Sequence, residues 1–441
     1  MSAPQGISGG QVYRFLMESQ YWPPEKMRAF QQMELASLLR HARATVPFYK
    51  TRLDPVFKKD GSIDWAQWSK LPILKRADVA VNYEAMQSSK LPEGHGPTAN
   101  FTTSGSTGHP VKVTFTKLMG DIGLIQDWRA QRWWNFDWSA VCVSWVGGLP
   151  EDWETKSRVA RGPWGYYSDA QPQLGHHYIY HVNAPVEDQL KHLHDVNAQY
   201  LCAQSNIAYA AGLELLKTNK RGKIDNMILV SSSIEPEYYA TLFEAFGTKV
   251  SALYSSKEAG RIGYSCVTGK HYHVCADSVL VEILNDQDGP CEIGQTGRVV
   301  VTPFYNTAQP FIRYDQGDLA SWGKPCACGI RLPVIDKIDG RSLHLFTSPE
   351  GTRFGRIIPE HFRANLNAEF WQFAQVGPKQ IEVRYKPIGK REKRRELSFS
   401  PMLVSTFLPG FEISYKILKN LPLTKSGKFI KYVNEWVNQI S

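Results

Sequence analysis

Residues Phe101–Lys112 read FTTSGSTGHPVK, a run of small hydroxylated residues and glycines that ends in a proline, a valine and a lysine. The run shows neither helical nor alternating spacing of apolar residues, which predicts a loop. Its hydroxyl and backbone N–H groups are hydrogen-bond donors, and Gly105 and Gly108 can take positive φ and turn these donors into a concavity that binds polyanions. The spacing is not the G-x-x-x-x-G-K-[ST] of a Walker loop, and for this run alone an ordinary surface turn stays an alternative.

The length and composition of the chain indicate a globular protein of more than one domain. Its 441 residues exceed what one hydrophobic core usually supports, so we expect a large domain and a smaller one. The net charge of +9 favours an anionic partner, which could be a nucleotide, coenzyme A, an acidic carrier protein or nucleic acid. Nucleic acid is not expected, because the chain shows no signature of a nucleic-acid-binding module and its densest basic run, Lys390–Arg395, has no interleaved aromatic residues.

The amino-terminal residues and the cysteines bear on the compartment. The first residues, MSAPQGISGGQVYRFL, lack the basic and apolar regions of a signal peptide, and no run of about 18 apolar residues occurs. We therefore expect a cytoplasmic protein that does not enter a membrane. Seven cysteines in so long a chain are too few, and odd in number, for a disulfide scaffold. The Cys326-Ala-Cys328 sequence suggests a metal instead.

Hydrophobic spacing predicts an α/β fold for the large domain. Leu35, Leu38, Leu39 and Ala42 follow helical spacing, so residues 25–44 are expected to form a helix that Pro47 ends. The runs 227–230 and 250–254 read as buried strands around a helix at 235–246, which makes a βαβ unit. Paired strands at 279–284 and 298–302 would form a smaller β subdomain beside it. The other expected elements are a strand at 113–116, an apolar run at 141–145, helices at 118–133 and from 186, and, in a small α+β domain beyond 340–341, strands at 380–386 and 411–418 and helices at 359–368 and 431–438.

Four further stretches carry candidate chemistry. Tyr254–Glu258 (YSSKE) follows a predicted strand, where α/β sheets place their ligands. Ile312–Leu319 (IRYDQGDL) puts Asp318 on a turn. Ile338–Arg341 (IDGR) ends the large domain, and Pro422–Lys428 (PLTKSGK) is a Gly-Lys turn near the carboxyl end. Each stretch alone is weak evidence, but in this order and at these separations they resemble the adenylate-forming superfamily of acyl-CoA synthetases, peptide-synthetase adenylation domains and luciferases.

Within that superfamily the chain resembles the phenylacetate-CoA ligases. The resemblance rests on VPFY, LPILKRAD, TTSGSTGHP, IRYDQGDLA, CACGIRLP and IDGR, and it covers about residues 35–345. It implies a large domain at 1–340 for the nucleotide and the acid, and a small mobile domain at 341–441 that carries a catalytic lysine. In relatives the small domain closes one way for adenylation and then rotates to admit the acceptor, which implies a hinge at 340–343 here.

The same resemblance assigns roles that fit the chemistry. A carboxylate attacks the α-phosphate of ATP and expels pyrophosphate, so the protein must hold a triphosphate and neutralise its charge. Glu258 would hold Mg²⁺, and Lys428 would place a charge between the carboxylate and the α-phosphate, with Lys425 as the weaker candidate. Tyr254 would face the adenine, and Asp318 would accept hydrogen bonds from the ribose, with a turn-capping aspartate as its alternative. The implied nucleotide-binding residues are Thr103, Ser104, Gly105, Ser106, Thr107, Gly108, Ser232, Tyr254, Ser255, Ser256, Asp318 and Arg341; Glu258 and Lys428 are the catalytic ones.

The chain departs from the family at three places. Lys257 stands where relatives usually carry threonine or serine, and Lys112 also lies near the loop, so the phosphate site is expected to be unusually cationic. The residues after Arg341 lack the acidic pair and the glycine-containing sequence of relatives, which makes the second half-reaction the less firmly implied one. Ser231–Glu235 replaces a more glycine-rich stretch beneath the adenine.

Cys266, His273, Cys326 and Cys328 are the expected ligands of a structural zinc ion. Both pairs are expected on loops, and zinc with thiolate and imidazole ligands prefers a closed tetrahedron. The phenylacetate-CoA ligase branch commonly shows a Cys and a His at the first position and Cys-x-Cys-Gly at the second, which this chain matches. His271 and Cys275 compete as ligands, and four unrelated residues are the alternative.

The activity that the resemblance implies is the ATP-dependent activation of a carboxylic acid, with an aromatic or arylacetic acid favoured. The acyl-adenylate would pass its acyl group to coenzyme A, with ATP, Mg²⁺ and a structural Zn²⁺ as cofactors. One alternative is transfer to an amine or to an acidic carrier protein. Another is a nucleotide-binding module without turnover, which the presence of Lys428, Glu258 and Asp318 disfavours. The acid, the acceptor and the assembly stay open, with a homodimer as one option.

Overall fold

The computed structural model of the chain divides into two units between Asp339 and Gly340. The residues that it describes are 9–102, 111–146, 159–166, 173–182, 184–230, 234, 236–269, 271–341, 346–347, 353–354, 366–390, 393–402, 408, 410–420, 429 and 432–436. No helix within these ranges is long and apolar enough to cross a membrane.

Helix α2 (Pro24–Thr45) shows how the sequence sets the boundaries of a helix. Pro24 lies in the first turn, where a missing N–H costs nothing, and Val46 is extended because Pro47 follows it. Leu35, Leu38 and Leu39 are buried, so the helix expected at 25–44 is confirmed. The other helices of the first unit are α1 (Gly9–Ser19), α3 (Arg76–Val81), α4 (Lys117–Trp133), α5 (Val186–Asp195), α6 (Ser205–Lys217) and α7 (Pro236–Phe246), with 3₁₀ turns at Pro47–Tyr49, Asp54–Val56 and Trp65–Lys70.

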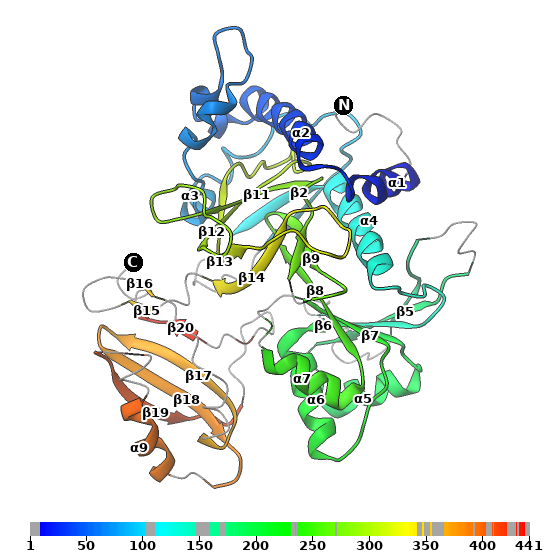
Figure 1. Cartoon of the computed structure of the whole chain (residues 1–441), viewed down its shortest axis with the longest axis vertical. Coiled ribbons are helices and arrows are strands. Elements are labelled where there is room, and N and C mark those ends of the chain that lie inside the picture. Colours follow the sequence, from blue (N-terminus) through cyan, green and yellow to red (C-terminus); the bar gives the residue numbers. More distant parts are fainter. Residues whose placement is uncertain are drawn as a thin grey trace. The chain divides into compact units, whose positions relative to one another are not determined.

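The first unit is built on a long mixed sheet with the strand order β11-β12-β13-β14-β10-β9-β8-β7-β6-β3-β5-β4. Figure 1 shows α5, α6 and α7 grouped beside the strands around β6 and β7, with α1, α2 and α4 grouped at the other end of the unit. The strands are β3 (Cys142–Val146), β4 (Val159–Pro163), β5 (His176–His181), β6 (Tyr200–Gln204), β7 (Asn226–Val230), β8 (Lys249–Ser256), β9 (Gly260–Ser265), β10 (Tyr272–Val274), β11 (Val279–Leu284), β12 (Thr296–Pro303), β13 (Tyr314–Trp322) and β14 (Val334–Arg341). A separate antiparallel pair consists of β1 (Thr98–Thr102) and β2 (Lys112–Thr116).

Strand β8 joins a parallel half of this sheet to an antiparallel half. Lys249–Ala252 pairs in parallel with β7, whereas Leu253–Ser256 pairs antiparallel with β9, and the register shifts between Tyr254 and Ser255. The expected βαβ unit is therefore confirmed as β7, α7 and β8, and the expected strand pair is confirmed as β11 and β12. The YSSKE stretch covers the carboxyl end of β8 and the turn that follows, and α/β sheets bind ligands at the carboxyl ends of their strands.

The second unit contains a four-stranded sheet in the order β19-β18-β17-β20. Its core includes Trp371, Phe373, Ile381 and Val383 from the two central strands. The elements are β15 (Phe346–Thr347), β16 (Arg353–Phe354), β17 (Ala368–Gly377), β18 (Gln380–Pro387), α9 (Lys393–Met402), β19 (Glu412–Ile417) and β20 (Tyr432–Asn434). The strands expected at 380–386 and 411–418 are confirmed as β18 and β19.

The helix expected at 431–438 is wrong where the structure describes it, whereas Leu366, inside the helix expected at 359–368, is helical. Tyr432–Asn434, inside the helix expected at 431–438, form β20 and pair in parallel with Phe373–Gln375. Aromatic and β-branched side chains fit a half-buried sheet surface, and this packing outweighs the local spacing. Ala368, the last residue of the helix expected at 359–368, begins β17, and residues 359–365 lie outside the described ranges.

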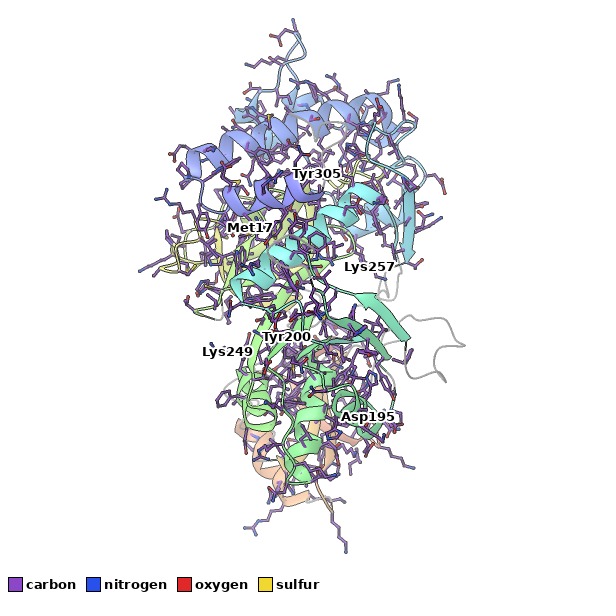
Figure 2. All side chains as sticks on the ribbon, turned by 90° about the vertical axis from the view of Figure 1, so that its right-hand side faces the viewer. Met17, Asp195, Tyr200, Lys249, Lys257 and Tyr305 are labelled. Carbon is purple, nitrogen blue, oxygen red and sulfur yellow. The ribbon has the colours of Figure 1, made fainter. Side chains whose placement is uncertain are left out.

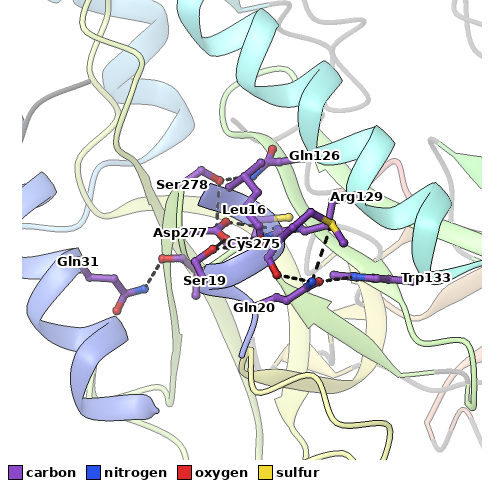
Figure 3. A network of polar contacts seen from close by, with 12 residues as sticks. Leu16, Ser19, Gln20, Gln31, Gln126, Arg129, Trp133, Cys275, Asp277 and Ser278 are labelled. Carbon is purple, nitrogen blue, oxygen red and sulfur yellow. Dashed lines mark hydrogen bonds and ion pairs between the residues drawn. The ribbon is translucent and has the colours of Figure 1, made fainter. Parts of the chain in front are cut away.

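A buried polar network fastens α1 and α4 to the turn after β10 (Figure 3). The Arg129 guanidinium makes an ion pair with the Asp277 carboxylate, and both side chains have no exposed surface. Ser19 donates a second hydrogen bond to Asp277 at 2.7 Å. Burial alone would lower the pKa of Arg129, but the Asp277 carboxylate raises it, so the guanidinium stays charged.

We expect Arg129→Met to destabilise the first unit by about 3–5 kcal/mol, because it leaves the Asp277 carboxylate buried without a counter-ion. The exposed pair Lys191–Asp195 provides a matched control, and Lys191→Met should cost less than about 1 kcal/mol. Urea unfolding followed by circular dichroism measures both changes. Equal losses in the two variants would contradict this account.

Candidate functional site

Tyr254 and Asp318, which lie far apart in the sequence, meet in the structure. Tyr254 comes from β8 and Asp318 from β13, and the Tyr254 hydroxyl donates to Asp318 Oδ2 at 2.7 Å. Both residues are half-buried. The Tyr254 ring also packs edge-on against Tyr272, with 6.5 Å between the ring centroids. The hydrogen bond orients the Asp318 carboxylate and leaves it acceptor capacity for further donors.

Asp318 lies on a bulged part of strand β13, and not on the turn that the sequence predicts. Gly317 has a φ of +71°, and the strand register to β12 shifts here, so the chain bends without leaving the sheet. The turn-capping role belongs to Asp315, whose Oδ1 accepts from the Gly317 N–H at 2.8 Å. The Asp318 carboxylate accepts from the Tyr254 hydroxyl.

Glu258 is a buried carboxylate, with only 4% of the residue exposed. The Arg76 guanidinium, at the start of α3, donates to Glu258 Oε1 at 3.2 Å. The Tyr314 hydroxyl, on β13, donates to the same oxygen at 3.4 Å. A buried carboxylate needs such partners to replace the hydration that it loses, and carboxylate oxygens are ligands that Mg²⁺ prefers.

The residues between Tyr254 and Glu258 connect the sheet to the serine and glycine-rich run. Ser256 Oγ accepts from the Ala259 N–H at 3.0 Å, which closes the turn between β8 and β9. Ser255 lies opposite Arg261 in that strand pair. The Lys257 ammonium, labelled in Figure 2, donates to the Thr102 carbonyl at 2.8 Å. Because Thr102 is both the last residue of β1 and the second residue of the run Phe101–Lys112, Lys257 ties the start of that run to the YSSKE stretch.

Several expected site residues lie outside the described residues: Thr103, Ser104, Gly105, Ser106, Thr107, Gly108, Ser232 and Lys428. Their flanks are described. Thr102 pairs with Lys112 across β1 and β2, so residues 103–111 join two adjacent strand ends. Val230 ends β7 just before Ser232, and Arg341 is the last residue of β14.

The structure brings the expected cysteine and histidine residues together at one end of β9 and β10. The sulfur atoms of Cys266 and Cys326 are 3.6 Å apart, and Cys328 Sγ lies 3.3 Å from His273 Nε2. His271 joins them, since single ligand atoms of Cys266, His271, His273 and Cys326 all lie within 4.8 Å of one another. Ligands of tetrahedral zinc are separated by roughly 3.5–3.8 Å, as follows from zinc–sulfur and zinc–nitrogen bonds of about 2.3 and 2.0 Å.

The chemistry of these side chains fits a zinc ion. Burial lowers the pKa of His273 to about 4, so its imidazole is neutral and can act as a ligand at neutral pH. Burial opposes ionisation of Cys326, but hydrogen bonds from the backbone and thiol of Cys328 and from Cys266 lower its pKa to about 6. His271 Nε2 is buried without a hydrogen-bond partner. Cys275, the other competing ligand, is fully buried and is not part of this group.

Arg76 and Tyr314 are site residues that the sequence did not single out. Both lie inside stretches that carried the resemblance, LPILKRAD and IRYDQGDL. Their role could not be read from those stretches, because Arg76 is 182 residues from Glu258 along the chain. A cationic residue inside a stretch that resembles a family motif was the available signal.

Comparison with solved structures shows which fold the chain has. The chain superposes on 2-hydroxyisobutyryl-CoA ligase, in its postadenylation state with R3-HIB-AMP, with a TM-score of 0.71 over 98% of this chain and 93% of that one, at 16% identity. The same enzyme with 2-HIB-AMP and CoA, in its thioesterification state, gives a TM-score of 0.59 over 96% and 94%, at 16% identity. The chain therefore has the fold of the adenylate-forming enzymes, and the α/β class expected from the sequence is confirmed.

Within that class, the sequence is similar to a particular enzyme. It is 24% identical over 334 residues to the phenylacetate-coenzyme A ligase of Thermus thermophilus, which covers 72% of each protein. A scan against models of protein families finds no match. The resemblance to phenylacetate-CoA ligases drawn from the motifs is confirmed by this relative.

Proposed function

We propose that the protein is an AMP-forming acid–thiol ligase that activates a carboxylic acid with ATP and transfers the acyl group to coenzyme A. The observation that carries the proposal is the convergence of Tyr254, Asp318 and Glu258 beside the end of β1, where the serine and glycine-rich run begins. The fold shared with CoA ligases and the similarity to phenylacetate-CoA ligase support the same conclusion. An aromatic or arylacetic acid is the proposed substrate.

The proposed reaction has two steps. A carboxylate oxygen of the acid attacks the α-phosphorus of ATP, and pyrophosphate leaves with the bridging oxygen. The thiol of coenzyme A then attacks the acyl carbonyl, and AMP leaves. In the first step Asp318 would accept from the ribose hydroxyls, and Glu258 would hold Mg²⁺, which neutralises phosphate charge when bound. The backbone and hydroxyl donors of Thr103–Gly108 would hold the β- and γ-phosphates.

The acceptor is the part of the proposal that has a rival. Transfer to an amine or to an acidic carrier protein would use the same adenylate, and the sequence after Arg341 departs from that of relatives.

We expect pyrophosphate release to depend on the added acid across a library of carboxylic acids, with the fastest release for aryl and arylacetic acids. Mass spectrometry of the products with and without coenzyme A identifies the acceptor. A protein that binds ATP but releases no pyrophosphate with any acid would contradict the proposal.

We expect Lys428→Ala and Asp318→Asn to fail in different ways. Loss of Lys428 removes a charge positioned on the transition state, so acid-dependent pyrophosphate release should fall about 10²-fold or more while ATP binding is kept. Asp318→Asn should weaken ATP binding about tenfold, because the hydrogen bonds to a charged group are lost. The matched control is Lys425→Ala, in the same PLTKSGK stretch, which should keep both properties. Near-normal adenylation in Lys428→Ala would remove Lys428 from the mechanism.

We also propose that the cysteine and histidine cluster binds a structural zinc ion. Cys266, His273, Cys326 and Cys328 are the proposed ligands. His271 competes for one of the four positions, because its ring nitrogen lies within 4.8 Å of the ligand atoms of Cys266, His273 and Cys326. A closed tetrahedral site has no open position for substrate, so the ion would hold the loops after β9 and β13 together.

Metal analysis tests this directly. The purified protein should contain about one equivalent of zinc, and Cys326→Ser should lose most of it and unfold at a lower temperature. Cys291→Ser, which changes a buried cysteine outside the cluster, is the matched control and should keep the metal. Less than about a tenth of an equivalent in the native protein, with stability unchanged by chelation, would rule the site out.

A further inference from the structure

The two hydrogen bonds to the buried Glu258 carboxylate are both made to one oxygen. Arg76 Nη1 and Tyr314 OH both donate to Oε1, at 3.2 and 3.4 Å. Among the described residues, no hydrogen bond reaches Oε2. The carboxylate is therefore held through one oxygen while the other stays available to a ligand.

The backbone fixes Arg76 and Tyr314 next to each other. Leu74 forms a parallel bridge with Tyr314: its N–H donates to the Arg313 carbonyl at 2.9 Å, and its carbonyl accepts from the Asp315 N–H at 2.9 Å. Two residues later, Arg76 begins α3, and the Asp78 carboxylate accepts from the Lys75 N–H at 2.9 Å, which caps this helix. The guanidinium thus comes from a helix start that is attached to the strand carrying Tyr314.

The Arg313 side chain strengthens this attachment. Arg313 is 1% exposed, donates to the Ser69 and Leu71 carbonyls at 3.0 and 2.7 Å, and pairs with Glu282 through both carboxylate oxygens. A buried arginine that satisfies two backbone carbonyls leaves the segment before α3 little freedom. Arg76 therefore reaches Glu258 from a rigid support, as a residue that orients a metal ligand must.

We propose that Arg76 is a positioning residue for acid activation, which holds Glu258 by Oε1 and presents Oε2 to the magnesium ion of the bound nucleotide. The inference rests on the proposed function, in which Glu258 is the metal ligand. The inference names the residue that orients this ligand. That residue, Arg76, lies on α3 and is 182 residues away from Glu258 in the sequence.

A competing role would have the opposite sign. If Arg76 served as a stand-in cation that magnesium had to displace, its removal would strengthen metal binding, because one positive charge next to the site would disappear. If Arg76 orients the carboxylate, its removal lets the carboxylate rotate and weakens metal binding. Groups that orient metal ligands are typically worth about 10–100-fold in metal affinity.

The test measures nucleotide binding in the absence of an acid, so that no turnover occurs. Calorimetric titration of ATP into the full-length protein, with Mg²⁺ and then with a chelator, gives the enhancement of ATP affinity by the metal. In Arg76→Met this enhancement should fall about tenfold or more, while ATP affinity under chelation stays unchanged. Arg76→Lys, which keeps a donor, should recover part of it. Lys75→Met, at the exposed neighbouring position, should behave like the native protein.

Two comparisons make the result decisive. Glu258→Gln should lose the enhancement, and Arg76→Met combined with Glu258→Gln should lose no more than Glu258→Gln alone, because both changes act on one carboxylate. An enhancement that is unchanged or increased in Arg76→Met, but lost in Glu258→Gln, overturns the role of Arg76 and leaves the proposed function intact. An enhancement kept in Glu258→Gln overturns the metal-binding role of Glu258 itself. Tyr314→Phe, which removes the longer bond to Oε1, provides a second variant should Arg76→Met not fold, and a smaller loss is expected.

Discussion

The proposed nucleotide site depends on one carboxylate, Glu258, that is buried inside the protein. At 4% exposure Glu258 has little access to water, and a buried carboxylate without hydrogen-bond partners would destabilise the fold. Arg76 and Tyr314 provide the compensation, and each is fixed by elements that belong to other parts of the sequence. The packing of the segment before α3 on β13 is therefore part of the site, although it contains no residue that the chemistry requires directly.

Strand β8 explains why the other site residues gather at the same place. The first half of β8 pairs in parallel with β7, and its second half pairs antiparallel with β9. The chain therefore turns back after β8, and β9 runs beside it in the opposite direction. Tyr254 and Asp318 then face each other from β8 and β13, close enough for a 2.7 Å hydrogen bond. Lys257, at the following turn, reaches the carbonyl that ends β1. An unusual lysine in the motif thus acquires a local role, as a tether at the start of the run Phe101–Lys112.

Elements with strong local patterns could be predicted from the sequence. Helix α2, the β7-α7-β8 unit and the β11-β12 pair follow from spacing and from prolines, because burial of one face decides their type. The expected helix over Tyr432–Asn434 failed because pairing with β17, far away in the sequence, determined the conformation. The hydrogen bond between Tyr254 and Asp318 joins two of the stretches named by motif, but the contact of Arg76 with Glu258 could not be predicted, since its partner is set by tertiary structure. Asp318 shows the same limit: sequence placed it on a turn, whereas a single positive φ at Gly317 lets it stay within a strand.

The position of the cysteine and histidine cluster argues for a structural role that is independent of the phosphates. Glu258 precedes β9 and Cys266 follows it, so a strand rise of about 3.4 Å per residue separates the two ends by roughly 20 Å. The cluster instead adjoins the buried network of α1 and α4. The Trp133 ring packs edge-on against His273, with its Nε1 donating to Gln20 Oε1 at 2.5 Å, and the Arg331 N–H donates to the Gln20 carbonyl at 2.8 Å. An ion at this place would join the loop after β9 to the loop after β13, next to the network of α1 and α4. It would influence the substrate only indirectly, by holding in place the strands β9 and β13. Tyr254 pairs with β9, and Asp318 lies on β13.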